Sequence, residues 1–153
     1  MTETERFLRE RWYAQRSIGR LMMDLSLAKR AYEESYNDAS LTCDLTKARS
    51  SQRSTLSPVE YSAVLVVDHY RAEMESIEKR LAAERRKAAM IEQAVKQAGL
   101  DPREEEYVRL RYFENRSVEA TAQRLYCSLA TCGRIRESAL RKIKQRVGLR
   151  QET

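Results

Sequence analysis

Ser117 to Leu140 read SVEATAQRLYCSLATCGRIRESAL, and these residues have the pattern of two short helices joined by a tight turn. Two helices that cross closely need a small residue at the crossing, and Ala122 supplies it in the first helix. Apolar residues recur at steps of three and four on both inner faces. Those expected to pack are Val118, Leu125 and Cys127 from the first helix and turn, and Cys132, Ile135, Ala139 and Ile143 from the second helix.

The second of these helices carries the basic excess of the chain. Between Ser128 and Arg150, seven Lys or Arg residues accompany one acidic residue, Glu137, so the segment has the same net charge of +6 as the whole chain. Lys and Arg beside phosphates supply most of the non-specific affinity of DNA-binding proteins. The charge therefore favours double-stranded DNA as the partner over a basic face that is merely solvated and complements the helix dipole.

Helix signals also mark the residues before this motif. Asp101-Pro102-Arg103-Glu104 combines an acidic cap, a proline at the first helical position and a glutamate three residues after the cap. Breaks are expected at Asn115-Arg116 and at Tyr126-Cys127. The predicted C-terminal helices are Pro102 to Phe113, Ser117 to Leu125 and Ser128 to Val147.

Two much longer helices are predicted in the first two thirds of the chain. The first runs from about Thr4 to Tyr36, and the second starts at the capping sequence Ser57-Pro58-Val59-Glu60 and runs to Ala98, with Gly99 as its left-handed end. Each has an apolar stripe with seven-residue spacing, so the two helices must bury these stripes against each other or against another copy of the chain. The stripes comprise Phe7, Ala14, Ile18, Leu21, Leu25, Ala28 and Tyr32, then Val67, Tyr70, Met74, Ile77, Leu81, Ala88, Ile91, Val95 and Ala98.

The periodicity stops between these helices, where residues 37–57 are mostly Ser, Thr, Lys, Arg and Asp. We interpret them as a polar loop, which at about twenty residues is long for a compact domain. The predicted domains are a helical hairpin over residues 1–99, which we expect to assemble a homodimer or higher homo-oligomer, and a DNA-binding domain over residues 100–153.

Composition agrees with an all-α fold of a long antiparallel helical pair followed by a small helix-turn-helix module. Four Gly and two Pro in 153 residues leave few turns for a β sandwich or a glycine-looped enzyme. The longest apolar run, Ala63 to Val67, is too short to cross a membrane, and the charged N-terminus has no signal-peptide core. Three cysteines cannot all pair within one chain, which favours a reducing, cytoplasmic location.

The stretch from Asp101 to Leu149 resembles region four of bacterial sigma factors. The resemblance lies in the acidic opening, in Leu110 to Glu114 (LRYFE), in Ser117-Val118-Glu119, and in Ser128, Thr131, Arg134 and Ala139-Leu140. It implies a DNA-binding helix-turn-helix and contact with RNA polymerase. Three residues depart from the pattern: Tyr126 replaces the usual turn glycine, Thr121 a buried isoleucine and Cys132 a valine. The layout of two long helices before the module is similar to phage and prophage transcriptional regulators of the ArpU and RinA type.

Docking of the module as in its relatives would place the start of the last helix in the major groove of DNA. Arg134 is the best candidate for a base contact, because arginine bonds guanine with two hydrogen bonds, and Leu129 or Ala130 would meet a thymine methyl group. The candidate DNA-binding residues are Ser128, Leu129, Ala130, Thr131, Gly133, Arg134 and Glu137. The candidate phosphate contacts are Arg116, Arg124, Arg136, Arg141 and Lys142.

No residue pattern predicts catalysis, a metal or a cofactor. Cys43, Cys127, Cys132 and His69 lack the spacing of a zinc site, Glu104 to Glu106 suit the first turn of a helix, and no glycine-rich loop could hold a phosphate. Two alternatives to a transcription regulator stay open. One is a phage small terminase subunit, which recognises DNA for packaging, and the other is a structural coiled-coil adaptor that binds protein.

Overall fold

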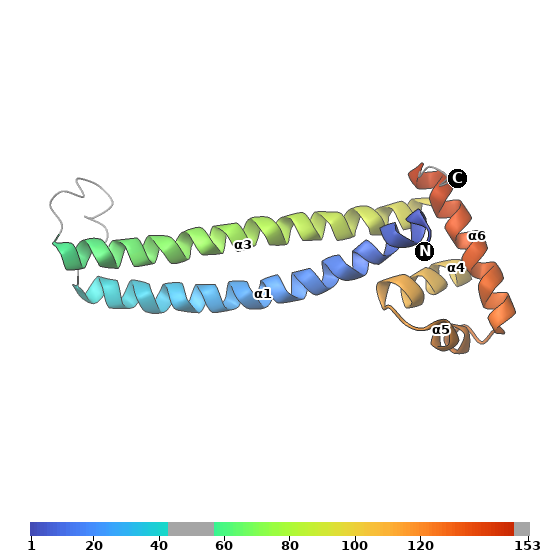
Figure 1. Cartoon of the computed structure of the whole chain (residues 1–153), viewed down its shortest axis with the longest axis horizontal. Coiled ribbons are helices and arrows are strands. Elements are labelled where there is room, and N and C mark those ends of the chain that lie inside the picture. Colours follow the sequence, from blue (N-terminus) through green and yellow to red (C-terminus); the bar gives the residue numbers. More distant parts are fainter. Residues whose placement is uncertain (43–56, 149–153) are drawn as a thin grey trace. The chain divides into compact units, whose positions relative to one another are not determined.

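The computed structural model describes residues 1–42 and 57–148, and every regular element in them is helical (Figure 1). Two long helices come first, and a module of short helices follows, which confirms the predicted all-α class. The elements are α1 (Glu3–Thr42), α3 (Pro58–Gln97), α4 (Pro102–Val108), the π-helical turn η2 (Arg109–Phe113), α5 (Val118–Arg124) and α6 (Leu129–Val147).

The helix signals predicted from the sequence are present at both ends of α3. The Ser57 amide donates to Glu60 Oε2 over 2.8 Å, and the Glu60 amide donates to Ser57 Oγ over 3.2 Å, which is the reciprocal capping box. After the last residue of α3, Gly99 has a φ of 66° and ends the helix in the left-handed conformation. Local sequence therefore sets both ends of this helix.

The chain divides into two compact units, and both long helices contribute to each. The first unit contains residues 1–18 and 83–153, and the second contains residues 19–82. These packing units do not coincide with the predicted division at residue 99. That division separated a region for self-assembly from a region for DNA binding, and it stays a prediction. The N-terminal turns of α1 belong to the same unit as α4, α5 and α6.

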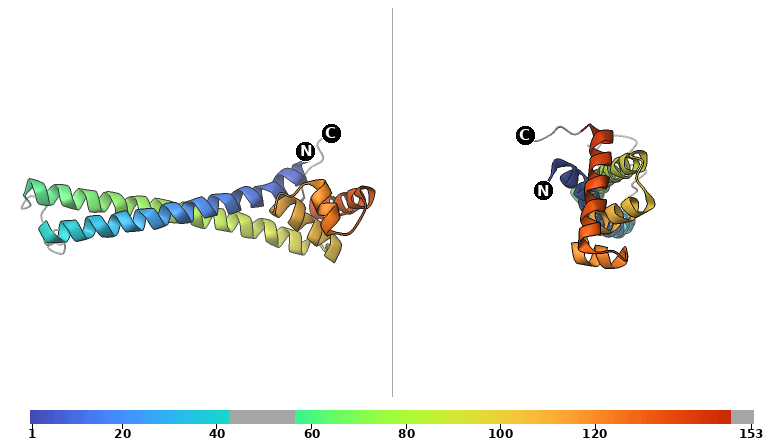
Figure 2. Two further views of the ribbon diagram at one scale, coloured as in Figure 1. Left: turned by 90° about the horizontal axis from the view of Figure 1, so that it is seen from below. Right: turned by 90° about the vertical axis from the view of Figure 1, so that its right-hand side faces the viewer.

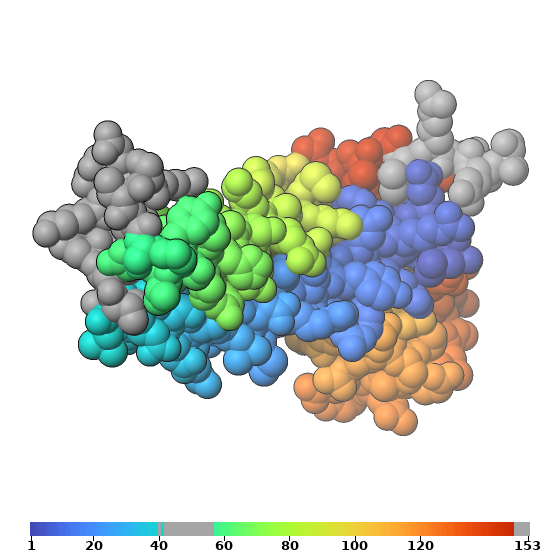
Figure 3. Space-filling view, turned by 60° about the vertical axis from the view of Figure 1, so that its left-hand side comes forward, coloured from blue at the N-terminus to red at the C-terminus, as the bar shows by residue number. Residues whose placement is uncertain are grey.

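In the second unit, α1 and α3 lie side by side (Figure 3), and their buried residues belong to the predicted stripes. Leu21 and Ala28 of α1 are buried seven residues apart, and Val67, Ile77 and Leu81 of α3 are buried at steps of ten and four residues, which keeps each set on one helix face. Burial of these stripes is the main source of helix stability here, because isolated helices gain little in water.

The prediction of a loop from residue 37 was wrong for its first residues, because α1 continues to Thr42. Ala39 is buried and packs with Val67, and Tyr36, Ala63 and Val64 surround this contact. Tertiary packing thus extends the helix through a polar sequence whose own periodicity is weak. The rest of the predicted loop, residues 43–56, lies outside the described residues.

The core of the first unit joins the module to the ends of both long helices. Leu8 of α1 and Ile91 of α3 are fully buried against the module. Within the module, α6 packs against both α4 and α5 (Figure 2). The module residues in this core are Tyr107, Val108, Leu110, Tyr112, Ala122, Leu125, Cys132, Ala139 and Ile143.

The first module helix was predicted as one α-helix over residues 102–113, but it widens into a π-turn from Arg109. The Glu114 amide donates to the Arg109 carbonyl, five residues back, over 2.9 Å. Leu110 and Tyr112 are both buried, although side chains two residues apart on an ideal α-helix point about 200° from each other.

Candidate nucleic-acid interface

The turn between α5 and α6 has helix-turn-helix geometry, fixed by two serine caps. Ser117 Oγ accepts from the Ala120 amide over 3.1 Å at the start of α5, and Ser128 Oγ accepts from the Thr131 amide over 3.2 Å at the start of α6. Between the helices, Tyr126 has a φ of 51° and its side chain is 94% exposed. Tyr126 thus adopts the left-handed conformation that glycine usually provides, and the turn is kept.

The inner face of the motif follows the prediction with one exception. Ala122 is buried at the crossing, and Cys132, Ala139 and Ile143 of α6 are buried opposite. Val118 was predicted to pack inward and is instead 36% exposed at the start of α5. Thr121 is fully buried, and its hydroxyl donates to the Ser117 carbonyl over 2.8 Å. This hydrogen bond satisfies the polar group that burial would otherwise penalise.

The opposite face of α6 is accessible along its length. Arg134, Glu137 and Arg141 recur there at steps of three and four, and all three are exposed. Thr131 and Gly133 are half-exposed, and a side chain at Gly133 would meet no atom within 4 Å. The other predicted DNA-binding residues, Ser128, Leu129 and Ala130, are exposed at the first turn of the helix. All seven candidates are therefore reachable from solvent. No close packing in the described part of the chain requires a glycine at position 133.

The predicted phosphate contact Arg136 already has a partner within the first unit. Its guanidinium pairs with Glu5 Oε1 over 2.9 Å, and the same carboxylate oxygen accepts from the Tyr112 hydroxyl over 2.9 Å. Burial alone would raise the pKa of Glu5, but bonds from the Thr2 amide, Arg136 and Tyr112 lower it to about 2. Arg136 therefore holds the first turn of α1 against the module, while 44% of its side chain stays exposed.

Lys142 is held in a similar way at the other end of the module. Its Nζ lies 2.7 Å from Glu104 Oε2 and 3.6 Å from Asp101 Oδ2. Glu104 also accepts from the Asp101 amide over 2.8 Å, as the predicted cap of α4 requires. Burial opposes ionisation of Glu104, yet the bonds from Lys142, Ser138 and Asp101 lower its pKa. The Lys142 charge thus ties α6 to the start of α4.

The remaining predicted phosphate contacts differ in how far they are engaged. Arg116 pairs with Glu114 over 2.7 Å. Within residues 1–42 and 57–148, Arg124, Arg134 and Arg141 form no ion pair, and all three are exposed. Arg134 and Arg141 are consequently the predicted contacts whose charge is most available to an external anion, whereas the charge of Arg124 also helps to lower the pKa of Glu106.

Sequence reasoning missed Glu5 and Tyr112 as organisers of this unit. Glu5 looks like an ordinary acidic residue in the first turn of a helix, and 131 positions separate it from Arg136. No periodicity or motif joins residues so distant in sequence.

The other constellations considered from the sequence have no functional geometry. His69 is exposed beside Tyr70, Cys127 and Cys132 are unpaired thiols, and Cys43 lies outside the described residues. Among the residues with described positions, no group of three or more His, Cys, Asp or Glu side chains could hold a metal ion. The described helices include none that is long and apolar enough to cross a membrane.

Comparison with protein families matches residues 98–145 to Sigma-70, region 4. This family binds DNA and interacts with RNA polymerase, and it is not catalytic. The match covers α4 to most of α6, which are the elements that build the helix-turn-helix. Searches of curated proteins and of solved structures gave no match to the chain.

Proposed function

We propose that the protein is a sequence-specific DNA-binding regulator of transcription, with α6 as its recognition helix in the major groove. The observation that carries this proposal is the outer face of α6, which is accessible, rich in arginine and begins at a capped helix N-terminus. Phosphate contacts orient such a helix, and base contacts give it sequence preference.

Two exposed arginines take different roles in this proposal. Arg134 lies one turn into α6, at the depth where a side chain reaches base edges, and a bidentate contact to guanine suits it. Arg141 lies two turns further along the same face and, with Arg124 on α5, would contact phosphates. Arg116, Arg136 and Lys142 are retained as phosphate candidates that would have to share their charge with carboxylates of the chain.

The decisive experiment compares Arg134→Ala with Arg141→Ala on a consensus duplex, obtained by selecting bound DNA from a random pool, and on a random duplex. We expect Arg134→Ala to lose about 1–3 kcal/mol on the consensus and little on the random duplex. Arg141→Ala should weaken both alike and lower the salt dependence of binding by about one counterion. Affinity measured at three salt concentrations separates the two effects.

Arg80→Ala is the matched control, because it removes one exposed arginine from α3, far in sequence from the recognition helix. Its affinity for both duplexes should equal that of the wild-type chain. Equal losses on both duplexes for Arg134→Ala and Arg141→Ala would refute the assignment of roles. Retention of the chain on DNA that does not change with salt would refute DNA binding through phosphates and favour the adaptor.

The finer attributes of this function are also proposals. We propose a phage or prophage origin because the layout of the chain resembles regulators of the ArpU and RinA type, and contact with RNA polymerase because of the family that residues 98–145 match. A cytoplasmic location is proposed from the three cysteines, which cannot all pair within one chain, and agrees with a DNA partner. The number of subunits distinguishes a regulator from a small terminase subunit, since a monomer or dimer suits a regulator and a ring of about eight suits packaging.

A further inference from the structure

The exposed face of α1 in the second unit carries an ordered stripe of seven residues, here named the α1 stripe. Its members recur at steps of three and four, on a different face from the buried Leu21 and Ala28. Met23 and Leu27 are 69% and 56% exposed, so two large apolar side chains lie uncovered on this face of the helix. The α1 stripe consists of Arg20, Met23, Asp24, Leu27, Arg30, Ala31 and Glu34.

From this stripe we propose that α1 pairs antiparallel with α1 of a second copy of the chain, with Leu27 at the two-fold axis. In this register Arg20 faces the partner subunit's Glu34, and Asp24 faces the partner subunit's Arg30. Symmetry repeats each pair, giving four contacts between opposite charges. Within the described residues, none of these four side chains forms an ion pair with another group of its own chain.

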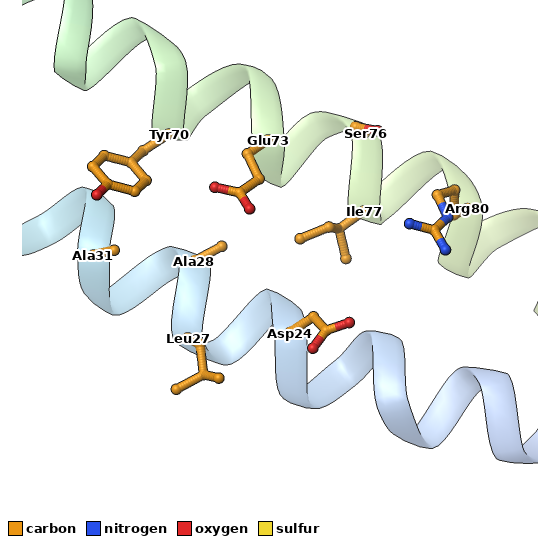
Figure 4. Close-up of a pocket in the computed structure, with 9 residues that line it drawn as sticks. All are labelled: Asp24, Leu27, Ala28, Ala31, Tyr70, Glu73, Ser76, Ile77 and Arg80. Atoms are coloured by element: carbon orange, nitrogen blue, oxygen red, sulfur yellow. The ribbon is translucent and has the colours of Figure 1, made fainter.

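The apolar members of the stripe match in the same register. Leu27 meets the partner subunit's Leu27, and Met23 meets Ala31, the smallest residue of the stripe. Ala31 lies beside a groove of about 470 Å³ between α1 and α3, which Ala28 and Tyr70 also line (Figure 4). An incoming methionine side chain, flexible and apolar, suits such an irregular space.

Charge order also determines the direction of the pairing. A parallel arrangement would place each member of the stripe against its own copy, so that Arg20, Asp24, Arg30 and Glu34 would all meet like charges. Like-charge contacts are destabilising, whereas the antiparallel register contains only opposite charges at these positions. The second copy therefore fits this face in the antiparallel direction only. This pairing does not depend on whether the module binds DNA.

The test is a charge-reversal series in the full-length chain, with subunit number measured by sedimentation over a range of concentrations. Wild type should dimerise. Arg20→Glu and Glu34→Arg should each raise the dimer dissociation constant at least about tenfold, because each turns two attractive contacts into repulsive ones. The double variant Arg20→Glu/Glu34→Arg should restore dimers, and an equimolar mixture of the two single variants should form the heterodimer.

Lys29→Glu and Glu33→Arg are the matched controls, since they make the same charge changes on exposed residues of α1 outside the stripe. They should dimerise like wild type, and circular dichroism verifies that every variant is folded. A monomeric wild type, unchanged association of the single variants, or failure of both the double variant and the mixture would each overturn the proposal. DNA affinity measured in parallel distinguishes this failure from failure of the proposed function.

Discussion

Glu5 connects the first turn of α1 to α6 through one carboxylate group. Its Oε1 accepts from the Tyr112 hydroxyl and pairs with Arg136, while Oε2 accepts from the Thr2 amide. A buried carboxylate is tolerated only when its oxygens are bonded in this way. The charge of Arg136, which we predicted from the sequence to contact phosphate, therefore stabilises the fold through its pair with Glu5.

The low pKa of Glu5 predicts an acid-sensitive contribution to stability. Its pKa falls from the usual 4.5 to about 2 in the folded chain, so folding favours the ionised form. The contribution, roughly 3 kcal/mol as an upper figure, is complete above pH 4.5 and is lost as the pH falls toward 2. Glu5→Gln should remove this slope and lower stability at pH 7, as measured by urea unfolding between pH 2 and pH 7.

Glu3→Gln serves as the control, because it changes a half-exposed glutamate in the same first turn of α1. Its stability should follow the pH dependence of wild type. If Glu5→Gln kept the full acid slope, another carboxylate would be responsible and the role given to Glu5 would be wrong. Glu104, which Lys142 and Asp101 hold ionised, would then be the next residue to replace.

At the scale of elements, the turn between α5 and α6 has tyrosine at a position whose left-handed backbone conformation favours glycine. Tyr126 has a positive φ and no covering contacts, and such a conformation costs a non-glycine residue about 1–2 kcal/mol. Tyr126→Gly should therefore stabilise the chain by about 1 kcal/mol, after the greater entropy of an unfolded glycine is subtracted. Thermal unfolding monitored by circular dichroism measures this change.

Asn115→Gly provides the comparison within the same module. Asn115 also has a positive φ, of 54°, but asparagine tolerates this conformation better than tyrosine does. We expect a smaller gain than for Tyr126→Gly. A loss of stability in Tyr126→Gly would mean that the exposed ring contributes a contact, and DNA affinity of that variant would show whether the ring serves the interface.

At the scale of the whole molecule, the helix-turn-helix module shares its core with residues from the other end of the chain. Leu8 is fully buried among module side chains. Leu8→Ala should cost about 2–5 kcal/mol, as removal of a large buried side chain does. Hydrogen exchange should rise in α4 to α6 as well as in α1, because these elements form one compact unit.

Leu65→Ala is the matched control, with the same change at a leucine that is 45% exposed on α3. Its effect on stability should stay within about 0.5 kcal/mol. If Leu8→Ala left exchange in α4 to α6 unchanged, the module would fold independently of α1, and the predicted domain division at residue 99 would describe stability as well as function.

Local sequence was sufficient for most of the elements and for the outward face of α6. Pattern alone predicts features that depend on neighbours within a few residues. These are the capping signals at Ser57 and Asp101, the seven-residue stripes and the inner face of α6. The end of α1 and the π-turn at Arg109 were not predictable in this way, because distant packing against Val67 and the module core overrides weak local preference.

The tertiary structure alone decided which charges are free. In the sequence, Arg134, Arg136, Arg141 and Lys142 are four basic residues of one predicted helix, and all four are candidate DNA contacts. Folding brings Glu5 to Arg136 and Glu104 to Lys142 from distant parts of the chain. Helical periodicity depends on residues close together in the sequence, so the sequence encodes it directly. The pairing of these charges depends on how folding brings distant segments together, and no short stretch of sequence contains that information.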